Sequence, residues 1–106
     1  MNWSIEFLPE ANDDLGSLDG SVRPQILKGI RKVSQDPLSN GYGKPLGNLS
    51  GSDLSGLMKI KFKKIGIRVV YKVEITDNVM KIIIISARSD NQVYEEAEKR
   101  RKKYKL

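Results

Sequence analysis

An isoleucine-rich segment in the C-terminal half constrains the fold more than any other feature. Residues 79–86 contain four consecutive isoleucines, at positions 82–85, next to Val79 and Met80. A short apolar run that is rich in β-branched residues is typical of a strand buried on both faces. We therefore expect this segment to form the core of a sheet.

Two further strands are predicted just before it. Residues 58–63 alternate strictly, with Met58, Ile60 and Phe62 on one side and Lys59, Lys61 and Lys63 on the other. This period of two predicts a strand with one apolar face and one basic face. A turn at Gly66 leads into a strand over residues 67–74, and Asp77-Asn78 turns the chain into the isoleucine-rich strand. These short connections predict an antiparallel meander.

The N-terminal part predicts one strand and two helices. Residues 3–8 alternate like a strand, and Pro9 suits the first turn of a helix over residues 9–18. Ser21 is placed to cap a second helix over residues 22–34. The apolar stripe expected to face the core consists of Val22, Ile26, Ile30 and Val33.

The remaining segments predict a long loop and a last helix. Residues 36–56 are rich in Pro, Gly, Ser and Asn and read as a surface loop with turns. Residues 92–104 predict a helix that Asp90 or Asn91 caps, with Val93, Ala97 and Tyr104 as its contact stripe. We expect a single α+β domain over residues 1–106 in the order β-α-α-β-β-β-α. An N-terminal helical hairpin and a C-terminal helix would then pack on an antiparallel sheet of about four strands.

Composition excludes several kinds of chemistry. The chain has no Cys, which excludes disulfides, a thiolate nucleophile and a Cys-based zinc site, and no His, which removes the commonest acid or base near neutral pH. The net charge of +6 favours polyanions or an acidic protein as partners. The first residues show no basic region followed by a long apolar stretch, and no apolar run is long enough to cross a bilayer, so we expect a cytoplasmic protein that is not exported and has no membrane contact.

Four cations are candidates for one binding surface. Lys59 and Lys61 lie about 7 Å apart on one face of their strand and repel each other unless an anion lies over them. Arg68 returns close to this face in the next strand, and Arg88 follows the isoleucine-rich strand. The alternatives are a solvated sheet face, protection against edge pairing, and a structural ion pair for Arg68.

Several motifs resemble those of RelE-type toxins. Residues 57–71 resemble the central hairpin of that family, with a Lys-x-Lys strand, a basic turn with Gly, and an Arg followed by two apolar residues and Tyr. Further similar segments are Trp3-Ser4-Ile5-Glu6-Phe7, Lys44-Pro45-Leu46, Leu49-Ser50-Gly51 and Val93-Tyr94-Glu95-Glu96-Ala97. The similarity spans nearly the whole chain. It departs from the family at Met58 and Ile67, where aromatic residues are frequent, and in lacking a His before Arg88.

The resemblance implies a RelE-like fold and the toxin of a type II toxin–antitoxin system, an endoribonuclease that cuts mRNA in the ribosomal A site. It implies the ribosome and an acidic antitoxin as partners, allows for a toxin–antitoxin hetero-oligomer, and implies no cofactor or metal. The family's catalytic cluster would fall on Lys59, Lys61, Arg68, Arg88 and Tyr94. Contacts with RNA or the ribosome are expected from Lys63, Lys64, Arg100, Arg101, Lys102 and Lys103.

Cleavage of RNA by its own 2′-OH needs a base, charge neutralisation on phosphorus and a proton for the leaving 5′-oxygen. We expect Arg68 to hold the scissile phosphate through a forked contact, Arg88 to contact the leaving oxygen, and Lys59 and Lys61 to stabilise charge. Tyr94 or a lysine would be the base, with a pKa lowered by the surrounding positive charge.

Two other functions remain open on the sequence. A ParE-like inhibitor of DNA gyrase would share the fold but lack the nuclease cluster. A basic module that binds RNA or protein without catalysis would leave growth unharmed when the chain is expressed alone.

Overall fold

The computed structural model describes residues 3–38, 40–46 and 54–106. Within these residues the elements follow in the order β1 (Ser4–Phe7), α1 (Pro9–Ser17), α2 (Arg23–Val33), β2 (Lys44–Pro45), β3 (Leu57–Phe62), β4 (Ile67–Glu74), β5 (Val79–Ser86) and α3 (Asp90–Lys103). No helix in this described part of the chain is both long and apolar enough to cross a membrane. The bounds of β4 and β5 are those that the sequence predicts.

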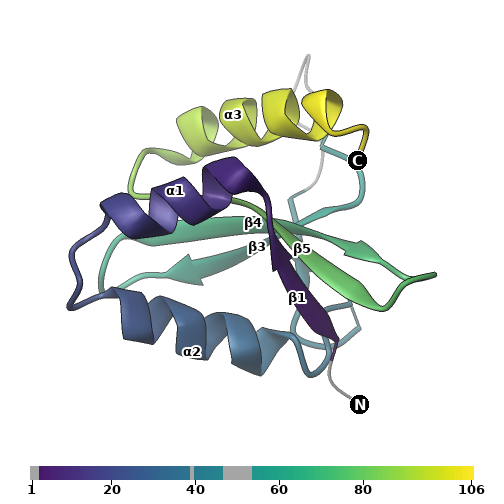
Figure 1. The fold of residues 1–106 in the computed structure, drawn as a ribbon, viewed down its shortest axis with the longest axis horizontal. Coiled ribbons are helices and arrows are strands. Elements are labelled where there is room, and N and C mark those ends of the chain that lie inside the picture. Colours follow the sequence, from purple (N-terminus) through teal and green to yellow (C-terminus); the bar gives the residue numbers. More distant parts are fainter. Residues whose placement is uncertain (1–2, 39, 47–53) are drawn as a thin grey trace.

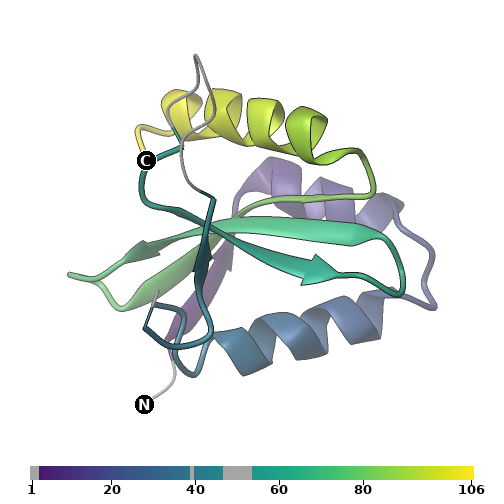
Figure 2. The ribbon, with the colours of Figure 1, turned by 180° about the vertical axis from the view of Figure 1, so that it is seen from behind.

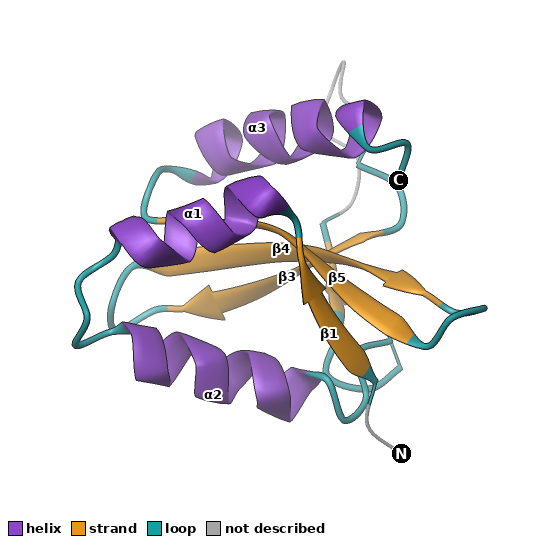
Figure 3. Ribbon diagram, viewed as in Figure 1, coloured by secondary structure: helices purple, strands orange, loops and turns teal. Residues whose placement is uncertain are grey.

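One mixed sheet runs through the molecule in the strand order β1-β5-β4-β3-β2 (Figure 3). The meander of β3, β4 and β5 is antiparallel, as predicted. The expected sheet of about four antiparallel strands differs from the structure in two ways. β1 pairs in parallel with β5, Ser4 opposite Val79, and the short β2 adds a fifth strand by pairing with β3. The α1–α2 segment and the first strands of the meander separate β1 from β5 in the chain. The pairing of β1 with β5 therefore involves no local turn that the sequence could indicate.

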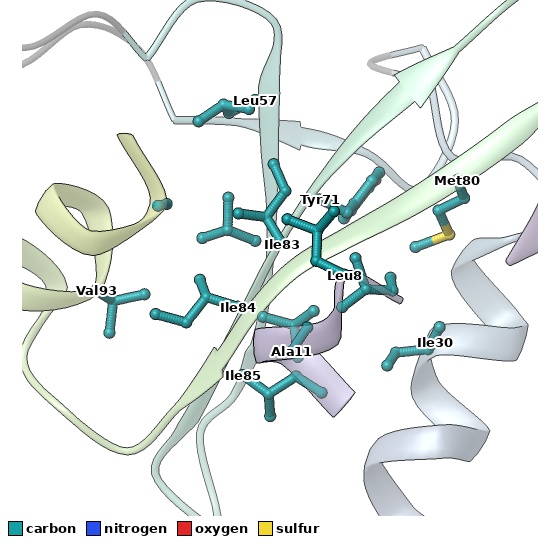
Figure 4. Packing of buried hydrophobic residues seen from close by; sticks show 14 of the residues in the cluster. Leu8, Ala11, Ile30, Leu57, Tyr71, Met80, Ile83, Ile84, Ile85 and Val93 are labelled. Atoms are coloured by element: carbon teal, nitrogen blue, oxygen red, sulfur yellow. The ribbon is translucent and has the colours of Figure 1, made fainter. Parts of the chain in front are cut away.

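Two helices cover opposite sides of the sheet. α3 lies on one side and α2 on the other (Figures 1 and 2). α1 runs along β5, beyond the point where β1 ends. Ile82, Ile83, Ile84 and Ile85 are all buried, and Figure 4 shows Val93 of α3 beside Ile84. The isoleucine-rich strand is therefore the centre of the core, as the sequence predicts.

The helix stripes are confirmed, but both predicted caps are wrong. In α2 the side chains of Ile26, Ile30 and Val33 are buried, as are Val93 and Ala97 in α3. Ser21 does not cap α2, because its backbone N–H donates to the Asp19 carboxylate in the preceding turn and the N-cap position is Val22. α3 begins two residues earlier than predicted, and Ser89 caps it through a capping box with Gln92.

The segment between α2 and β3 is only partly a surface loop. Leu54 is buried, and the hydroxyl of buried Tyr71 donates to the Pro37 carbonyl at 2.8 Å. Residues 39 and 47–53, including the Leu49-Ser50-Gly51 motif, lie outside the described residues.

An exposed polar contact joins α1 to the end of α3 and predicts a pH effect. Glu10 accepts hydrogen bonds from Lys103 Nζ at 2.8 Å and Tyr104 Oη at 2.6 Å. The Lys103 bond first, and then the Tyr104 bond, lower the pKa of Glu10 to about 2. A carboxylate whose pKa is lower in the folded than in the unfolded state stabilises the fold. This stabilisation is fully present at pH values above the unfolded pKa near 4.5 and is lost as the pH falls toward 2.

We expect thermal melts of the wild type and a Glu10→Gln variant to differ at pH 6 and to converge as the pH falls toward 2. Glu6→Gln, which removes an exposed carboxylate on β1, is the control. A difference between wild type and Glu10→Gln that stays constant over this pH range would contradict the assignment.

Candidate active site

The paired strands β3 and β4 bring two of the expected cations together. Lys61 lies directly opposite Arg68 in the β3–β4 register, and Arg68 lies opposite Ser86 of β5. Directly opposite residues in an antiparallel pair project from the same face. The spacing of Lys61, the Gly66 turn and Arg68 thus places both side chains on the face over which α3 begins.

The first turn of α3 adds a carboxylate to the two cations. Asp90 Oδ2 lies 3.3 Å from Lys61 Nζ, and Asp90 Oδ1 is in direct ion-pair contact with Arg68 Nε. Burial by itself raises the pKa of Asp90, but the Lys61 hydrogen bond and the charges of Arg68 and Lys61 outweigh it, so the pKa is lowered. Asp90 is therefore an anion at neutral pH. Lys61, Arg68 and Asp90 form what we call the ion-pair cluster.

Tyr94 lies one helical turn after Asp90 and completes the site. Its side chain is buried, and its hydroxyl has no hydrogen-bond partner among the described residues. Burial raises the pKa of Tyr94, the charge of Asp90 raises it further, and Arg68 lowers it only in part. The expectation that positive charge lowers this pKa is wrong, because burial and the neighbouring carboxylate dominate. The phenol is therefore protonated at neutral pH, and its hydroxyl carries a proton that no described acceptor binds.

Arg88 joins the site through its backbone. Arg68 Nη1 donates to the Arg88 carbonyl at 3.0 Å and so holds the segment that leads into α3. The Arg88 side chain is exposed and lies at a hollow lined also by Asp14, Glu96 and Arg100. Among the described residues, its guanidinium makes no hydrogen bond or ion pair with the ion-pair cluster. The structure therefore does not bring it together with Lys61 and Arg68.

The other expected cations fall into two groups. Lys59 and Lys63 line a hollow at the edge of β3, and Lys64 is exposed in the turn after it. Lys102 and Lys103 extend from α3 with side chains 69% and 64% exposed, although Lys103 is bound to Glu10. These side chains are accessible to a large partner.

Arg100 and Arg101, which are also expected to contact RNA, make structural contacts within the chain. The Arg100 side chain is only 11% exposed, and it bonds to Asp14 Oδ2 at 2.6 Å and to Glu96 Oε2 at 3.2 Å. Arg101 donates to the carbonyls of Ser55 and Leu106. Both arginines therefore have structural roles, and the RNA contacts expected of them stay predictions.

Sequence reasoning missed the part that Asp90 plays. The sequence predicts Asp90 only as a helix cap, whereas its carboxylate binds two cations of the candidate site. One signal was present, since Asp90 and Tyr94 are four residues apart and share one helix face. The described residues contain no group of three His, Cys, Asp or Glu side chains placed to hold a metal ion.

The structure resembles those of known toxins. No protein-family model matches the sequence, and no curated protein matches it significantly. Among solved structures, a free E. coli toxin RelE carrying two Arg-to-Ala substitutions is 28% identical, with 94% of this chain and 98% of that chain covered and a TM-score of 0.73.

Two further structures are complexes with antitoxins. A chain of the toxin–antitoxin complex RelBE2 from Mycobacterium tuberculosis is 20% identical, with 83% of this chain and 100% of that chain covered and a TM-score of 0.69. A chain of the RelE–RelB complex from Pyrococcus horikoshii is 20% identical, with 85% and 99% covered and a TM-score of 0.59. With its element order, its sheet and its match to E. coli RelE over most of its length, the chain has a RelE-like α+β fold and is similar to RelE toxins.

Proposed function

We propose that this chain is a RelE-like toxin, a metal-independent endoribonuclease that cuts mRNA in the ribosomal A site. One observation carries the proposal. Lys61 and Arg68, opposite each other on β3 and β4, direct their charged groups at a single carboxylate, Asp90. A carboxylate held by a Lys and an Arg occupies a position suited to two phosphate oxygens. The scissile phosphate would take the place of the Asp90 carboxylate.

The reaction would be attack by the RNA on itself. The 2′-OH gives its proton to a general base, for which the lysines of the site are the candidates, as its oxygen bonds to the adjacent phosphorus. The bond from phosphorus to the 5′-oxygen breaks, leaving a 2′,3′-cyclic phosphate and a 5′-hydroxyl. Lys61 and Arg68 would neutralise the charge that builds on the phosphate oxygens. Tyr94, whose phenol is protonated at neutral pH, would donate the proton to the leaving 5′-oxygen once the phosphate has displaced the Asp90 carboxylate.

Two cations flank this centre. Lys59 lies two residues before Lys61 on the same strand, so we assign it charge stabilisation of the neighbouring phosphate. The exposed guanidinium of Arg88 lies outside the Lys61–Arg68 pair and would contact the RNA beyond the scissile bond. It would not be the contact to the leaving oxygen.

Toeprinting of a defined mRNA on purified ribosomes tests the proposal. Addition of the protein should produce new mRNA ends in the A-site codon, with 2′,3′-cyclic phosphate on the upstream fragment. A single 2′-deoxy nucleotide before the cut should abolish that cut. Intact mRNA combined with DNA-damage signalling in cells would instead support gyrase inhibition, and unharmed growth would support a non-catalytic module.

We also propose an acidic antitoxin as the neutralising partner. The chain carries a net charge of +6, and chains that it matches are crystallised as RelB–RelE complexes. Carboxylates of an antitoxin would compete with RNA phosphates for the same exposed lysines.

Replacement of Asp90 by Asn should improve substrate binding. The wild-type carboxylate competes with phosphate for Lys61 and Arg68, and these ion pairs are partly exposed, with side chains 34% and 28% accessible. We expect the apparent KM for mRNA on ribosomes to fall about two- to fivefold, in line with the modest strength of exposed ion pairs.

Asp77→Asn, which removes a carboxylate at the far β4–β5 turn, is the matched control. A large loss of cleavage in Asp90→Asn, at unchanged melting temperature, would instead show that the carboxylate takes part in the chemistry.

A further inference from the structure

A basic groove lies beside the ion-pair cluster, between α2 and the edge of β3. Its volume is about 420 Å³, and its lining includes Lys32, Tyr42, Lys44, Lys59, Lys61 and Lys63. We call it the Tyr42 groove. None of its lining residues is acidic. A cavity of this size holds a small organic ligand or one unit of a polymer.

The charges in the groove are largely uncompensated. Lys61 is bound to Asp90, whereas Lys32, Lys44, Lys59 and Lys63 make no ion pair with any of the described residues. Lys44 and Lys59 are opposite each other in the β2–β3 register, so two like charges sit on adjacent strands. Like charges directly opposite each other destabilise a sheet unless an anion lies between them. A ligand with several negative charges would therefore fit the charge of the groove.

An exposed aromatic ring lies in the same groove. Tyr42 is 46% exposed, and Lys32 Nζ lies 5.4 Å from its ring centroid. A tight turn fixes the backbone that carries the ring, because the Tyr42 N–H donates to the Asp36 carbonyl at 2.8 Å and the Gly43 N–H to the Leu38 carbonyl at 3.0 Å. A Cβ on Gly43 would lie 2.3 Å from the Pro37 carbonyl oxygen, so this turn requires glycine.

Lysines that bind phosphates beside an aromatic ring that accepts a base are the means by which proteins hold unpaired nucleotides. We propose that the Tyr42 groove binds a nucleotide of the same RNA strand that is cut at Lys61 and Arg68, with its base on the Tyr42 ring. The inference rests on the proposed function and extends it to a subsite for the substrate.

The path of the strand follows from the sheet. β2 pairs with β3 only at Met58 and Lys59, so among the described residues no strand lies beside β3 on that side from Ile60 to Phe62. Lys61 belongs to both the ion-pair cluster and the Tyr42 groove. An RNA strand with one phosphate at Lys61 can therefore cross the open edge of β3 and place a flanking nucleotide against Tyr42. An acidic peptide would use the lysines but gain little from the ring.

Binding of a short fluorescent single-stranded RNA to the full chain, without ribosomes, tests this subsite. Tyr42→Leu should weaken binding about tenfold without changing the dependence on salt, because only stacking is removed. The double variant Lys32→Ala/Lys44→Ala should weaken binding and reduce the slope of log K against log salt by about 0.7 for each phosphate that the protein no longer neutralises. Lys99→Ala, an exposed lysine on α3, is the control and should change neither.

Toeprinting with the same variants separates this inference from the proposed function. Groove variants that weaken RNA binding, in a protein whose wild type never cuts mRNA, would uphold the subsite and overturn the nuclease. A wild type that cuts, with Tyr42→Leu unchanged in RNA affinity and in KM, would overturn the subsite alone. Loss of binding in the lysine variant but none in Tyr42→Leu, together with displacement of the RNA by a poly-glutamate peptide, would also overturn it.

Discussion

An Arg68→Ala variant is expected to cut ribosome-bound mRNA about 100- to 1,000-fold more slowly than the wild type, which is the usual effect of removing one charged donor from a transition state. Arg68 is central to the candidate site, because it contacts the Asp90 carboxylate through Nε and the Arg88 carbonyl through Nη1. Its side chain is 28% exposed, so the fold should survive the change with a small loss of melting temperature.

Arg68→Lys and Arg31→Ala complete this experiment. Lysine retains the charge but not the forked donors, so we expect an intermediate rate. Arg31 is an exposed arginine on α2, and its loss should leave the rate unchanged. The measurement is the single-turnover rate of appearance of the cleaved end. A rate for Arg68→Ala within a few-fold of the wild type would remove the ion-pair cluster from the mechanism.

The second large effect that we expect is a loss of stability when Arg100 is replaced. β1 pairs with β5 only as far as Ile82, and beyond that point α1 and α3 supply polar partners to the edge of β5. The Arg100 guanidinium donates to the Ile83 carbonyl at 2.9 Å, and the Asp14 carboxylate accepts from the Ile85 N–H at 3.1 Å. The two side chains also bind each other at 2.6 Å. This pair completes the sheet edge where the strand partner ends.

Arg100→Met keeps most of the side-chain volume but leaves the Asp14 carboxylate and the Ile83 carbonyl without their charged partner. We expect the free energy of unfolding in urea to fall by about 2–4 kcal/mol. Lys99→Met on the exposed face of the same helix should change it by less than about 0.5 kcal/mol.

A double-mutant cycle with Asp14→Asn isolates the pair, since the second substitution should cost much less in the Arg100→Met background. The fraction of Arg100→Met that remains folded should cut mRNA at the wild-type rate. Loss of cleavage without loss of stability would instead indicate that Arg100 contacts RNA.

Elements with a strong local pattern were predictable from sequence. β4 and β5 begin and end where the apolar runs and their turns place them, and the α2 stripe is buried as its spacing indicates. The positions of Lys61 and Arg68 on one face were predictable too, because a short turn sets the register of an antiparallel pair. Each of these features depends on residues close together in the chain.

Features that depend on distant residues were not predictable in this way. The parallel pairing of β1 with β5 joins positions more than seventy residues apart, Ser4 with Val79. The bulge between Val70 and Tyr71 leaves Ile83 as an extra residue opposite β4. Such pairings depend on how complete elements pack and not on a local period.

By itself, the sequence determined that this chain builds a sheet around an isoleucine-rich strand and carries Lys61 and Arg68 on one face of a hairpin. Only the tertiary structure decided three contacts. Asp90 binds both cations, Arg100 binds Asp14 and the Ile83 carbonyl at the edge of β5, and Tyr42 lines one groove with the lysines of β3. Local periodicity fixes the face on which a side chain lies, whereas the partner of a charge depends on which element folding brings against it.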